Sequence, residues 1–334
     1  MILVTGGAGY IGSHTVVELL NENYDVVILD NFVNSSPSVI DKIELITNKK
    51  IKFYEGNVLD RKVLNEIFND NEVSDVIHFA GLKSVSESLI KPYDYYNNNV
   101  TGTLTLVNEM VLNNVNNLIF SSSATVYGKP QEIPLTESCH IGETTNPYGT
   151  SKFVAEKMLT DISSANLKFN VTLLRYFNPV GAHPSGMIGE SPKGIPNNLV
   201  PYLTKVARGQ LECLSVFGSD YPTKDGTGIR DFIHVMDLAM GHVAALRNRK
   251  PERNLNIYNL GTGKGYTVLE LINAFERITG VKVNYRLSDR RDGDIAECWS
   301  DPSLARNELG WEASRSLDDM LRDVWNWENT KSNY

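Results

Sequence analysis

Short apolar runs recur through the first half of the chain and alternate with stretches whose apolar residues repeat at helical spacing. The runs with the length of a strand are residues 2–4, 26–29, 51–54, 76–79, 118–120 and 171–174. Alternation of strand and helix is typical of parallel strands joined by crossover helices. The pattern therefore predicts an α/β fold built on a doubly wound parallel sheet.

Two stretches, residues 92–113 and 147–165, have the best helical pattern in the chain. Both are long enough to pack against the sheet and to present a second face outward. A helical interface between two copies of the chain is therefore an expectation of the pattern.

The composition of the sequence changes after Phe177. Residues 178–230 are rich in proline, glycine and asparagine, which indicates loops and short elements that shape a site. Alternating signals return at residues 257–260 and 281–285, which we expect in a smaller C-terminal unit closed by a helix around residues 317–327. We predict a first domain over residues 1–177, with a returning segment near 232–258, and a smaller α/β domain over residues 178–334.

Composition excludes several classes of protein. The chain has 334 residues, a formal net charge of −8 and no basic stripe, which argues against nucleic-acid or anionic-membrane binding. Its start lacks the features of a secretory signal, and no apolar run approaches the ~20 residues of a membrane helix. Three widely spaced cysteines fit reduced thiols, and the six histidines have no metal-ligand spacing. We therefore expect a cytoplasmic protein without a metal site.

A glycine-rich loop follows the first predicted strand. Gly6, Gly9 and Gly12 are spaced three apart, and a helical pattern begins directly after them. Glycine lets backbone N–H groups approach a pyrophosphate, and the helix N-terminus adds a favourable dipole. The alternative is a glycine turn without a ligand, but the strand, the helix and an acidic residue all lie where a dinucleotide requires them.

The acidic residue is Asp30, eighteen residues beyond Gly12 and at the end of the second predicted strand. Its carboxylate can accept hydrogen bonds from an adenosine ribose, whereas a 2′-phosphate would face like charge. Residues 30–35 contain no arginine, so the sequence favours NAD over NADP.

A Tyr-x-x-x-Lys pair follows a cluster of hydroxyls at residues 121–123. If Pro147 opens a helix, Tyr148 and Lys152 lie four residues apart and project from one face. An ammonium near a phenol stabilises the phenolate and lowers its pKa, which is about 10 in water. Tyr148 can then remove a proton from a hydroxyl, although the same spacing also occurs on ordinary amphipathic helices.

The chain resembles the extended short-chain dehydrogenase/reductase family and, within it, the 4-epimerases of UDP-hexoses. The resemblance covers essentially the whole length and is most specific in residues 5–14, 30–31, 78–83, 121–128, 148–152, 175–182, 194–199 and 226–235. It implies a Rossmann-type NAD-binding first domain, a UDP-sugar-binding second domain and a homodimer. The implied activity is interconversion of UDP-glucose and UDP-galactose by inversion at sugar C4, through a transient 4-keto sugar and NAD.

The resemblance also implies roles for single residues. Tyr148 is the implied base at the sugar C4 hydroxyl, Ser123 the donor to the same oxygen, and Lys152 the group that lowers the pKa of Tyr148 and holds the ribose. The residues expected at the cofactor, from the glycine loop and the resemblance together, are Gly6, Gly9, Tyr10, Ile11, Gly12, Asp30, Asn31, Phe32, Val33, Asn34, Ser35, Asn57, Val58, Phe79, Ala80, Gly81, Leu82, Lys83, Asn98, Ser123, Tyr148, Lys152 and Phe177.

Asn57 is a departure, because the family usually has aspartate near the adenine amino group. The amide oxygen of Asn57 can still accept that hydrogen bond. We therefore expect altered adenine contacts without a change of cofactor class.

The residues that the resemblance implies at the UDP-sugar are Lys83, Ser123, Tyr148, Tyr176, Asn178, Asn198, Leu199, Val216, Phe217, Arg230, Arg291, Asp294 and Cys298. Arg230 and Arg291 offer planar, permanently charged forks for a diphosphate, although most arginines of a chain make only surface ion pairs. Cys298 is expected beside sugar C2, where a small side chain leaves room for an N-acetyl group. UDP-GlcNAc and UDP-GalNAc are then further substrates; otherwise Cys298 is only a small buried side chain.

Two other functions compete with epimerisation. A nucleotide-sugar 4,6-dehydratase or decarboxylase begins with the same oxidation, but such relatives carry an acidic residue just after the central Ser/Thr, where this chain has Ala124 and Thr125. A sensor that binds NAD without catalysis would be expected to have lost the trio Ser123, Tyr148 and Lys152, and all three are present.

Overall fold

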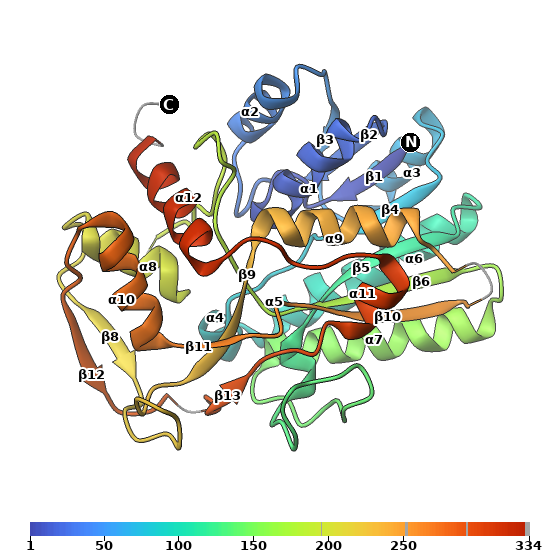
Figure 1. The fold of residues 1–334 in the computed structure, drawn as a ribbon. Coiled ribbons are helices and arrows are strands. Elements are labelled where there is room, and N and C mark those ends of the chain that lie inside the picture. Colours follow the sequence, from blue (N-terminus) through green and yellow to red (C-terminus); the bar gives the residue numbers. More distant parts are fainter. Residues whose placement is uncertain (195, 251–252, 292, 331–334) are drawn as a thin grey trace.

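A parallel sheet of seven strands is the largest feature of the computed structural model, which describes residues 1–194, 196–250, 253–291 and 293–330 (Figure 1). The strands run in the order β10-β6-β5-β4-β1-β2-β3. They are β1 (Ile2–Thr5), β2 (Val26–Asp30), β3 (Lys52–Glu55), β4 (Asp75–His78), β5 (Asn117–Ser123), β6 (Asn170–Tyr176) and β10 (Leu255–Leu260). The six strands expected from the apolar runs are all present, which confirms the doubly wound fold.

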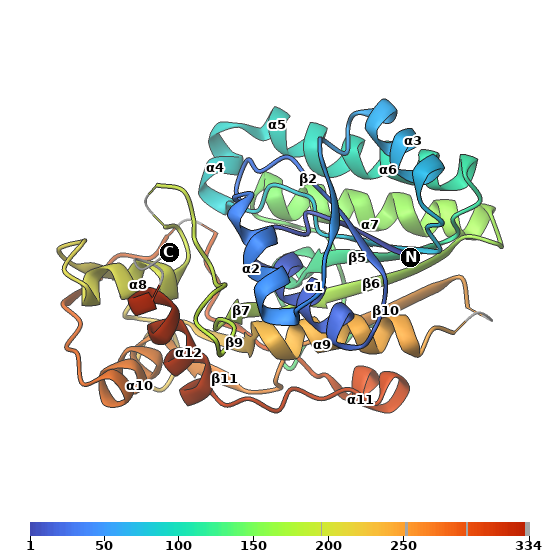
Figure 2. The same ribbon diagram turned by 90° about the horizontal axis from the view of Figure 1, so that it is seen from above.

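Helices cover both faces of this sheet (Figure 2). One face carries α1 (Tyr10–Asn21), α2 (Ser38–Thr47), α9 (Val235–Arg247) and α11 (Ser303–Leu309). The other carries α3 (Arg61–Asp70), α6 (Gly102–Leu112) and α7 (Pro147–Ala165). Each layer buries its own apolar cluster against the sheet, as a fully covered parallel sheet requires.

The strand order reverses between β1 and β4, because the chain builds β2 and β3 on one side of β1 and then returns to build β4, β5 and β6 on the other. Loops at the carboxyl ends of β1 and β4 therefore diverge and leave a crevice, the usual place for a ligand in such a sheet.

The two helices expected from periodicity differ in outcome. Helix α7 spans the 147–165 stretch, and the Asn146 side chain caps it by accepting a hydrogen bond from Gly149 N at 2.9 Å. The 92–113 stretch is divided into α5 (Pro92–Tyr96), a π-helical turn (Asn97–Thr101) and α6. A shorter helix, α4 (Val85–Ile90), precedes it, and a 3₁₀ turn (Ala124–Tyr127) follows β5.

The remaining elements form a smaller body beside the carboxyl ends of the large sheet, at the left of Figure 1. They are β7 (Asn178–Val180), α8 (Leu199–Ala207), β8 (Leu214–Phe217), β9 (Ile229–His234), β11 (Gly265–Thr267), α10 (Val268–Thr279), β12 (Tyr285–Ser288), β13 (Glu297–Cys298) and α12 (Leu317–Thr330). Strand β9 pairs with β7, β11 and β13, and β8 pairs with β12. Apolar residues of α8, α10 and α12 form its core, and α12 confirms the helix predicted around residues 317–327.

One expectation for this region was wrong, and one was only roughly placed. The 257–260 signal lies in β10, which is a strand of the large sheet, because its register beside β6 buries Tyr258 and Leu260 in that core. The 281–285 signal becomes a strand only from Tyr285 onward. The backbone of Val283 donates instead to Glu276, and the Asn284 carbonyl accepts from Leu214.

No helix among the described residues combines the length and apolar character needed to cross a membrane. The three cysteines, Cys139, Cys213 and Cys298, are all free thiols.

Candidate active site

The glycine loop lies at the crevice between β1 and β4. Gly6 has a φ of +71°, and a Cβ there would lie 2.7 Å from the backbone nitrogen of Ala80, which follows β4. At Gly12 a Cβ would lie 2.2 Å from the Gly6 carbonyl oxygen. Close packing between the loop, helix α1 and the end of β4 therefore needs glycine, and it leaves the helix N-terminus open to an anion.

Asp30, at the end of β2, stabilises the loops around this crevice through hydrogen bonds to its carboxylate. Its carboxylate accepts hydrogen bonds from Ala8 N at 3.0 Å, Phe32 N at 2.9 Å and the Ser35 hydroxyl at 2.8 Å. A carboxylate has about four acceptor positions, so these three bonds leave capacity for a ligand hydroxyl. Three donors from the protein orient Asp30 for the ribose role expected of it.

A pocket joins these elements. The predicted cofactor residues that line it are Gly6, Gly9, Asp30, Asn31, Val33, Asn34, Ser35, Asn57, Val58, Phe79, Ala80, Gly81, Leu82 and Asn98. Leu29 and Gly56 also line it and were missed, although Leu29 ends one predicted strand and Gly56 lies two residues after another. The Asn57 amide oxygen, expected to face adenine, accepts a hydrogen bond from Leu59 N at 3.0 Å, so it is partly used by its own turn.

Some predicted cofactor residues turn their side chains elsewhere. The Tyr10 hydroxyl donates to the Gly181 carbonyl at 2.7 Å, and burial raises its pKa well above the ordinary value. Phe177 is buried in a small apolar cluster. The side chain of Val216, predicted at the substrate, is buried in the core of the smaller body, so only its backbone remains available to a ligand.

Helix α7 carries the predicted acid-base pair. The Lys152 ammonium donates to the Ser121 carbonyl at 2.7 Å and lies 4.8 Å from the centre of the Phe120 ring. Burial lowers the pKa of Lys152 to about 8. A Cβ on Gly81, a pocket residue, would lie 3.7 Å from the same nitrogen. The Lys152 ammonium therefore lies next to the pocket residue Gly81 and is held there by the Ser121 carbonyl of β5.

The environment of Tyr148 differs from the expectation. Burial raises the pKa of Tyr148 above 10, and the opposing influences are a hydrogen bond from Ser123 and the positive charge of Lys83. The sequence assigned this lowering to Lys152, but that ammonium is bound to the backbone of β5. Burial therefore favours the neutral phenol, and Ser123 and Lys83 oppose that effect.

A buried ion pair supports α7 from beneath. Arg175 of β6 donates to Glu156 of α7, with its Nη2 2.8 Å from Oε2, and both side chains are 2% exposed. Glu156 also accepts from the Ser122 hydroxyl, while Arg175 donates to the Tyr127 phenol at 3.1 Å. The prediction did not include this pair, although Glu156 follows Tyr148 and Lys152 at the same four-residue spacing.

Asn99 was also missed. Its amide is 2% exposed, accepts from Leu82 N at 2.8 Å, and donates to Leu82 O and to the Ser151 hydroxyl, both at 2.9 Å. Because Ser151 in turn donates to the Tyr148 carbonyl at 2.7 Å, Asn99 ties the pocket loop to the first turn of α7. Its place in the π-helical turn was not evident from periodicity.

The predicted substrate residues form two groups in the smaller body. The Arg291 guanidinium lies 3.8 Å from the centre of the Phe217 ring, so these two are stacked. Cys298 in β13 is paired with Arg230 in β9 and packs against the cluster that contains Phe177. Burial raises the pKa of the Cys298 thiol to about 11, so the thiol is neutral at pH 7.

The other substrate candidates take different positions. Asn178 is exposed at the start of β7, Tyr176 is buried at the end of β6, Asp294 is exposed beside Arg291, and Leu199 is the first residue of α8. Asn198 donates to Glu190 at 3.0 Å, and Lys83 donates to the same oxygen at 2.7 Å. Glu190 was not predicted from the sequence.

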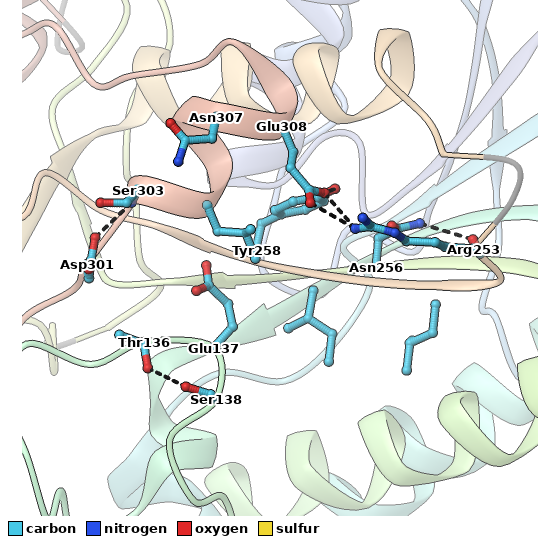
Figure 3. Close-up of a pocket in the computed structure, with 13 residues that line it drawn as sticks. Thr136, Glu137, Ser138, Arg253, Asn256, Tyr258, Asp301, Ser303, Asn307 and Glu308 are labelled. Atoms are coloured by element: carbon cyan, nitrogen blue, oxygen red, sulfur yellow. Dashed lines mark hydrogen bonds and ion pairs between the residues drawn. The ribbon is translucent and has the colours of Figure 1, made fainter.

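A separate cavity of about 580 Å³ lies at the outer edge of β10 (Figure 3). Its two glutamates already have partners: Glu308 accepts from Arg253 and from the Tyr258 hydroxyl, and Glu137 accepts from the backbone N–H of Asn259 outside the lining. None of the predicted site residues lines it. The pocket at the β1 and β4 ends is therefore the candidate active site.

Comparison with known proteins gives consistent results. The model of the "NAD dependent epimerase/dehydratase family" matches residues 2–261. The UDP-glucose 4-epimerase of Pasteurella multocida (strain Pm70) is 61% identical over 327 residues, 98% of this chain and 97% of that protein.

Solved structures give the same picture. The crystal structure of UDP-glucose 4-epimerase from Bifidobacterium longum in complex with NAD+ and UDP is 52% identical, with a TM-score of 0.96 over 99% of both chains. The UDP-Glc/GlcNAc 4-epimerase of Campylobacter jejuni is 37% identical, with a TM-score of 0.86 over 98% of this chain and 99% of that one.

Proposed function

We propose that this chain, which belongs to the NAD dependent epimerase/dehydratase family, interconverts UDP-glucose and UDP-galactose by inversion at sugar C4. It is an NAD-dependent isomerase, and its similarity to UDP-glucose 4-epimerases extends over nearly the whole chain. The observation that carries the proposal is the half-buried Tyr148 phenol, whose pKa responds to Ser123 and Lys83, on the helix that brings Lys152 to a glycine-lined dinucleotide pocket.

The pocket fits NAD on its own geometry. Gly6 and Gly9 line it where a side chain would strike backbone atoms, and Asp30 closes one end with acceptor capacity left for a ribose. Residues 31–35 supply no cation for a 2′-phosphate. When bound, NAD accepts hydride from the sugar carbon and returns it, and the positive nicotinamide ring favours a nearby phenolate.

The protein residues supply proton transfer and orientation. As phenolate, Tyr148 removes the proton from the C4 hydroxyl and later gives it back, while Ser123 hydrogen-bonds the same oxygen. Lys83 and Lys152 add positive charge around the phenolate. Because the proton, like the hydride, is returned, the reaction has no net oxidation.

The smaller body is the proposed anchor for UDP. Arg230 and Arg291 carry charged forks suited to a diphosphate, and Phe217 lies against Arg291 where a ring could stack. A tether at the nucleotide lets the 4-keto sugar turn over without leaving the site. The further contacts proposed for the sugar and uracil, namely Asn178, Asn198, Leu199, Tyr176 and Asp294, come from the same family pattern.

We also propose activity on UDP-GlcNAc and UDP-GalNAc. The support is the small side chain of Cys298 beside Arg230, and the similarity to the UDP-Glc/GlcNAc 4-epimerase of Campylobacter jejuni. A homodimer is proposed through residues 92–113 and 147–165, and a cytoplasmic location is proposed because the three cysteines are free thiols.

The decisive experiment incubates the purified protein with UDP-galactose, without added NAD, and follows the C4 epimers by NMR. The expected product is UDP-glucose of unchanged mass, whereas a dehydratase would release water and lower the mass of the nucleotide sugar. Deuterium at C4 should remain on the sugar. Free exchange of that deuterium with solvent would contradict hydride transfer to a bound cofactor.

A further inference from the structure

Glu190 lies between the two halves of the candidate active site. One of its carboxylate oxygens accepts from the Lys83 ammonium at 2.7 Å and from the Asn198 amide at 3.0 Å. Lys83 follows the pocket loop after β4, and Asn198 precedes α8 in the smaller body. The Glu190 side chain is 11% exposed, so the ion pair is partly shielded from water.

The backbone around Glu190 is fixed on several sides. The Trp327 indole of α12 donates to the Glu190 carbonyl at 3.2 Å, and a Cβ at Gly189 would lie 2.6 Å from the same indole ring. Gly189 also pairs with Ala182 in an isolated β-bridge. A carboxylate on so constrained a backbone can hold its partners at defined positions.

Lys83 is the link between Glu190 and the proposed base, Tyr148. Its positive charge lowers the pKa of Tyr148, in opposition to burial. Its ammonium also lies 5.7 Å from the centre of the Tyr10 ring, so it is held over the first turn of α1. The Lys83 side chain is 51% exposed and, without its carboxylate partner, would be free to move into solvent.

We propose that Glu190 is a positioning residue for the C4 inversion: through one oxygen it holds Lys83 over the Tyr10 ring at the start of α1 and ties the pocket loop to Asn198. This inference rests on the proposed function. The negative charge of Glu190 also opposes that of Lys83, so it limits how far Lys83 stabilises the phenolate.

Polar and charged groups from several elements face the side chains of Tyr148 and Glu190. Those around Tyr148 are Ser123 of β5, Lys83, Tyr176 of β6, Tyr95 of α5, and Lys152 on its own helix. Those around Glu190 are Lys83, Asn198 and the Tyr10 phenol. Lys83 is the cation common to both sets, so a change at Glu190 should reach Tyr148 through Lys83.

The test compares Glu190→Gln with Lys83→Met in the cofactor-loaded protein. Glutamine keeps an oxygen that accepts from Lys83 and Asn198 but removes the negative charge. We expect the acid limb of the kcat profile for UDP-galactose to shift about half a pH unit lower in Glu190→Gln and to shift higher in Lys83→Met. Asp161→Asn, which removes an exposed carboxylate from α7, is the matched control and should leave the profile unchanged.

A second measurement does not depend on turnover. The phenolate absorbance of each protein is titrated against the same protein carrying Tyr148→Phe, and the difference should show the same opposite displacements of the Tyr148 midpoint. Glu190→Ala, which releases Lys83 and Asn198, should raise KM for UDP-galactose about fivefold more than Glu190→Gln does.

The outcomes separate the two proposals. If inversion occurs but the limb and the midpoint of Glu190→Gln coincide with those of the parent and of Asp161→Asn, the role of Glu190 is wrong. If the parent does not invert C4 while the midpoints still move as expected, the proposed function is wrong and the positioning of Lys83 by Glu190 is supported.

Discussion

Among single residues, the proposed chemistry depends most on Tyr148 and on the groups that shift the pKa of its phenol. Burial raises the pKa of Tyr148, and Ser123 and Lys83 lower it only in part. We expect the phenol to lose its proton more easily when a positively charged ring binds nearby, because added positive charge lowers the pKa of a phenol.

Replacing Tyr148 with phenylalanine removes the proposed base and little volume. We expect kcat for UDP-galactose to fall at least about 100-fold, because general acid-base catalysis is lost. UDP affinity measured by calorimetry should stay within about threefold, since the nucleotide anchors lie elsewhere. Tyr285→Phe, at a side chain 41% exposed in β12, is the matched control. Parent-level turnover by Tyr148→Phe would eliminate the proposed base.

Cys298 is the second residue whose role can be tested alone. Cys298→Tyr adds a ring beside Arg230 and should fill space next to sugar C2. We expect kcat/KM for UDP-GalNAc to fall at least about 10-fold more than kcat/KM for UDP-galactose, measured by coupled assay. Equal losses on both substrates would mean that the ring disturbs the site in general. No turnover of either acetylated substrate by the parent would refute the pocket role of Cys298.

At the scale of elements, α7 is the part on which the site depends most. Tyr148, Lys152 and Glu156 are spaced four apart and face the sheet, with Glu156 buried against Arg175 of β6. Breaking a buried pair leaves one charge without compensation, whereas an exposed pair contributes little. Stability and catalytic geometry are therefore linked through one face of one helix.

Glu156→Ala should lower the free energy of unfolding by about 3 to 5 kcal/mol, because it leaves the buried Arg175 guanidinium unpaired. Lys157→Ala breaks the exposed pair with Asp161 on the same helix and should cost less than about 1 kcal/mol. Urea denaturation of both variants and the parent measures the difference. Similar stabilities for the two variants would show that the buried pair does not secure α7.

At the scale of the whole molecule, one surface is rich in exposed apolar side chains. Tyr93 is 77% exposed, Leu112 64% and Leu104 46%, all in α5 and α6, and Val154 of α7 is 36% exposed. These helices cover the same face of the large sheet (Figure 2). Single exposed apolar residues are common, but a group of them on adjacent helices is typical of a protein interface.

We expect the parent to sediment as a dimer and Leu104→Glu to weaken that dimer at least about 100-fold, because an unpaired charge would be buried at the contact. Leu45→Glu, at a 70% exposed position on α2 on the opposite face, is the matched control and should remain dimeric. Analytical ultracentrifugation over a concentration series distinguishes these cases. A monomeric parent would remove the proposal.

Features that depend only on neighbouring residues could be predicted before the fold was known. Apolar runs bounded by helical stretches specify six of the seven strands of the large sheet, Asn146 and Pro147 specify the start of α7, and glycine spacing specifies the turn after β1. Each is a local constraint of backbone geometry or burial, and so it can be read from a short window of residues.

Contacts between distant residues became evident only in the complete fold. It moved the 257–260 signal into the large sheet, bound Lys152 to the β5 backbone, and brought Lys83 and Asn198 to one oxygen of Glu190. The Lys152 and Lys83 contacts join residues 31 and 107 positions apart, and the place of β10 depends on strand order, so no local pattern specifies them. Asn198 is only eight residues from Glu190, but it meets Lys83 there only in the complete fold. The charge around Tyr148 follows from burial and packing of the complete fold.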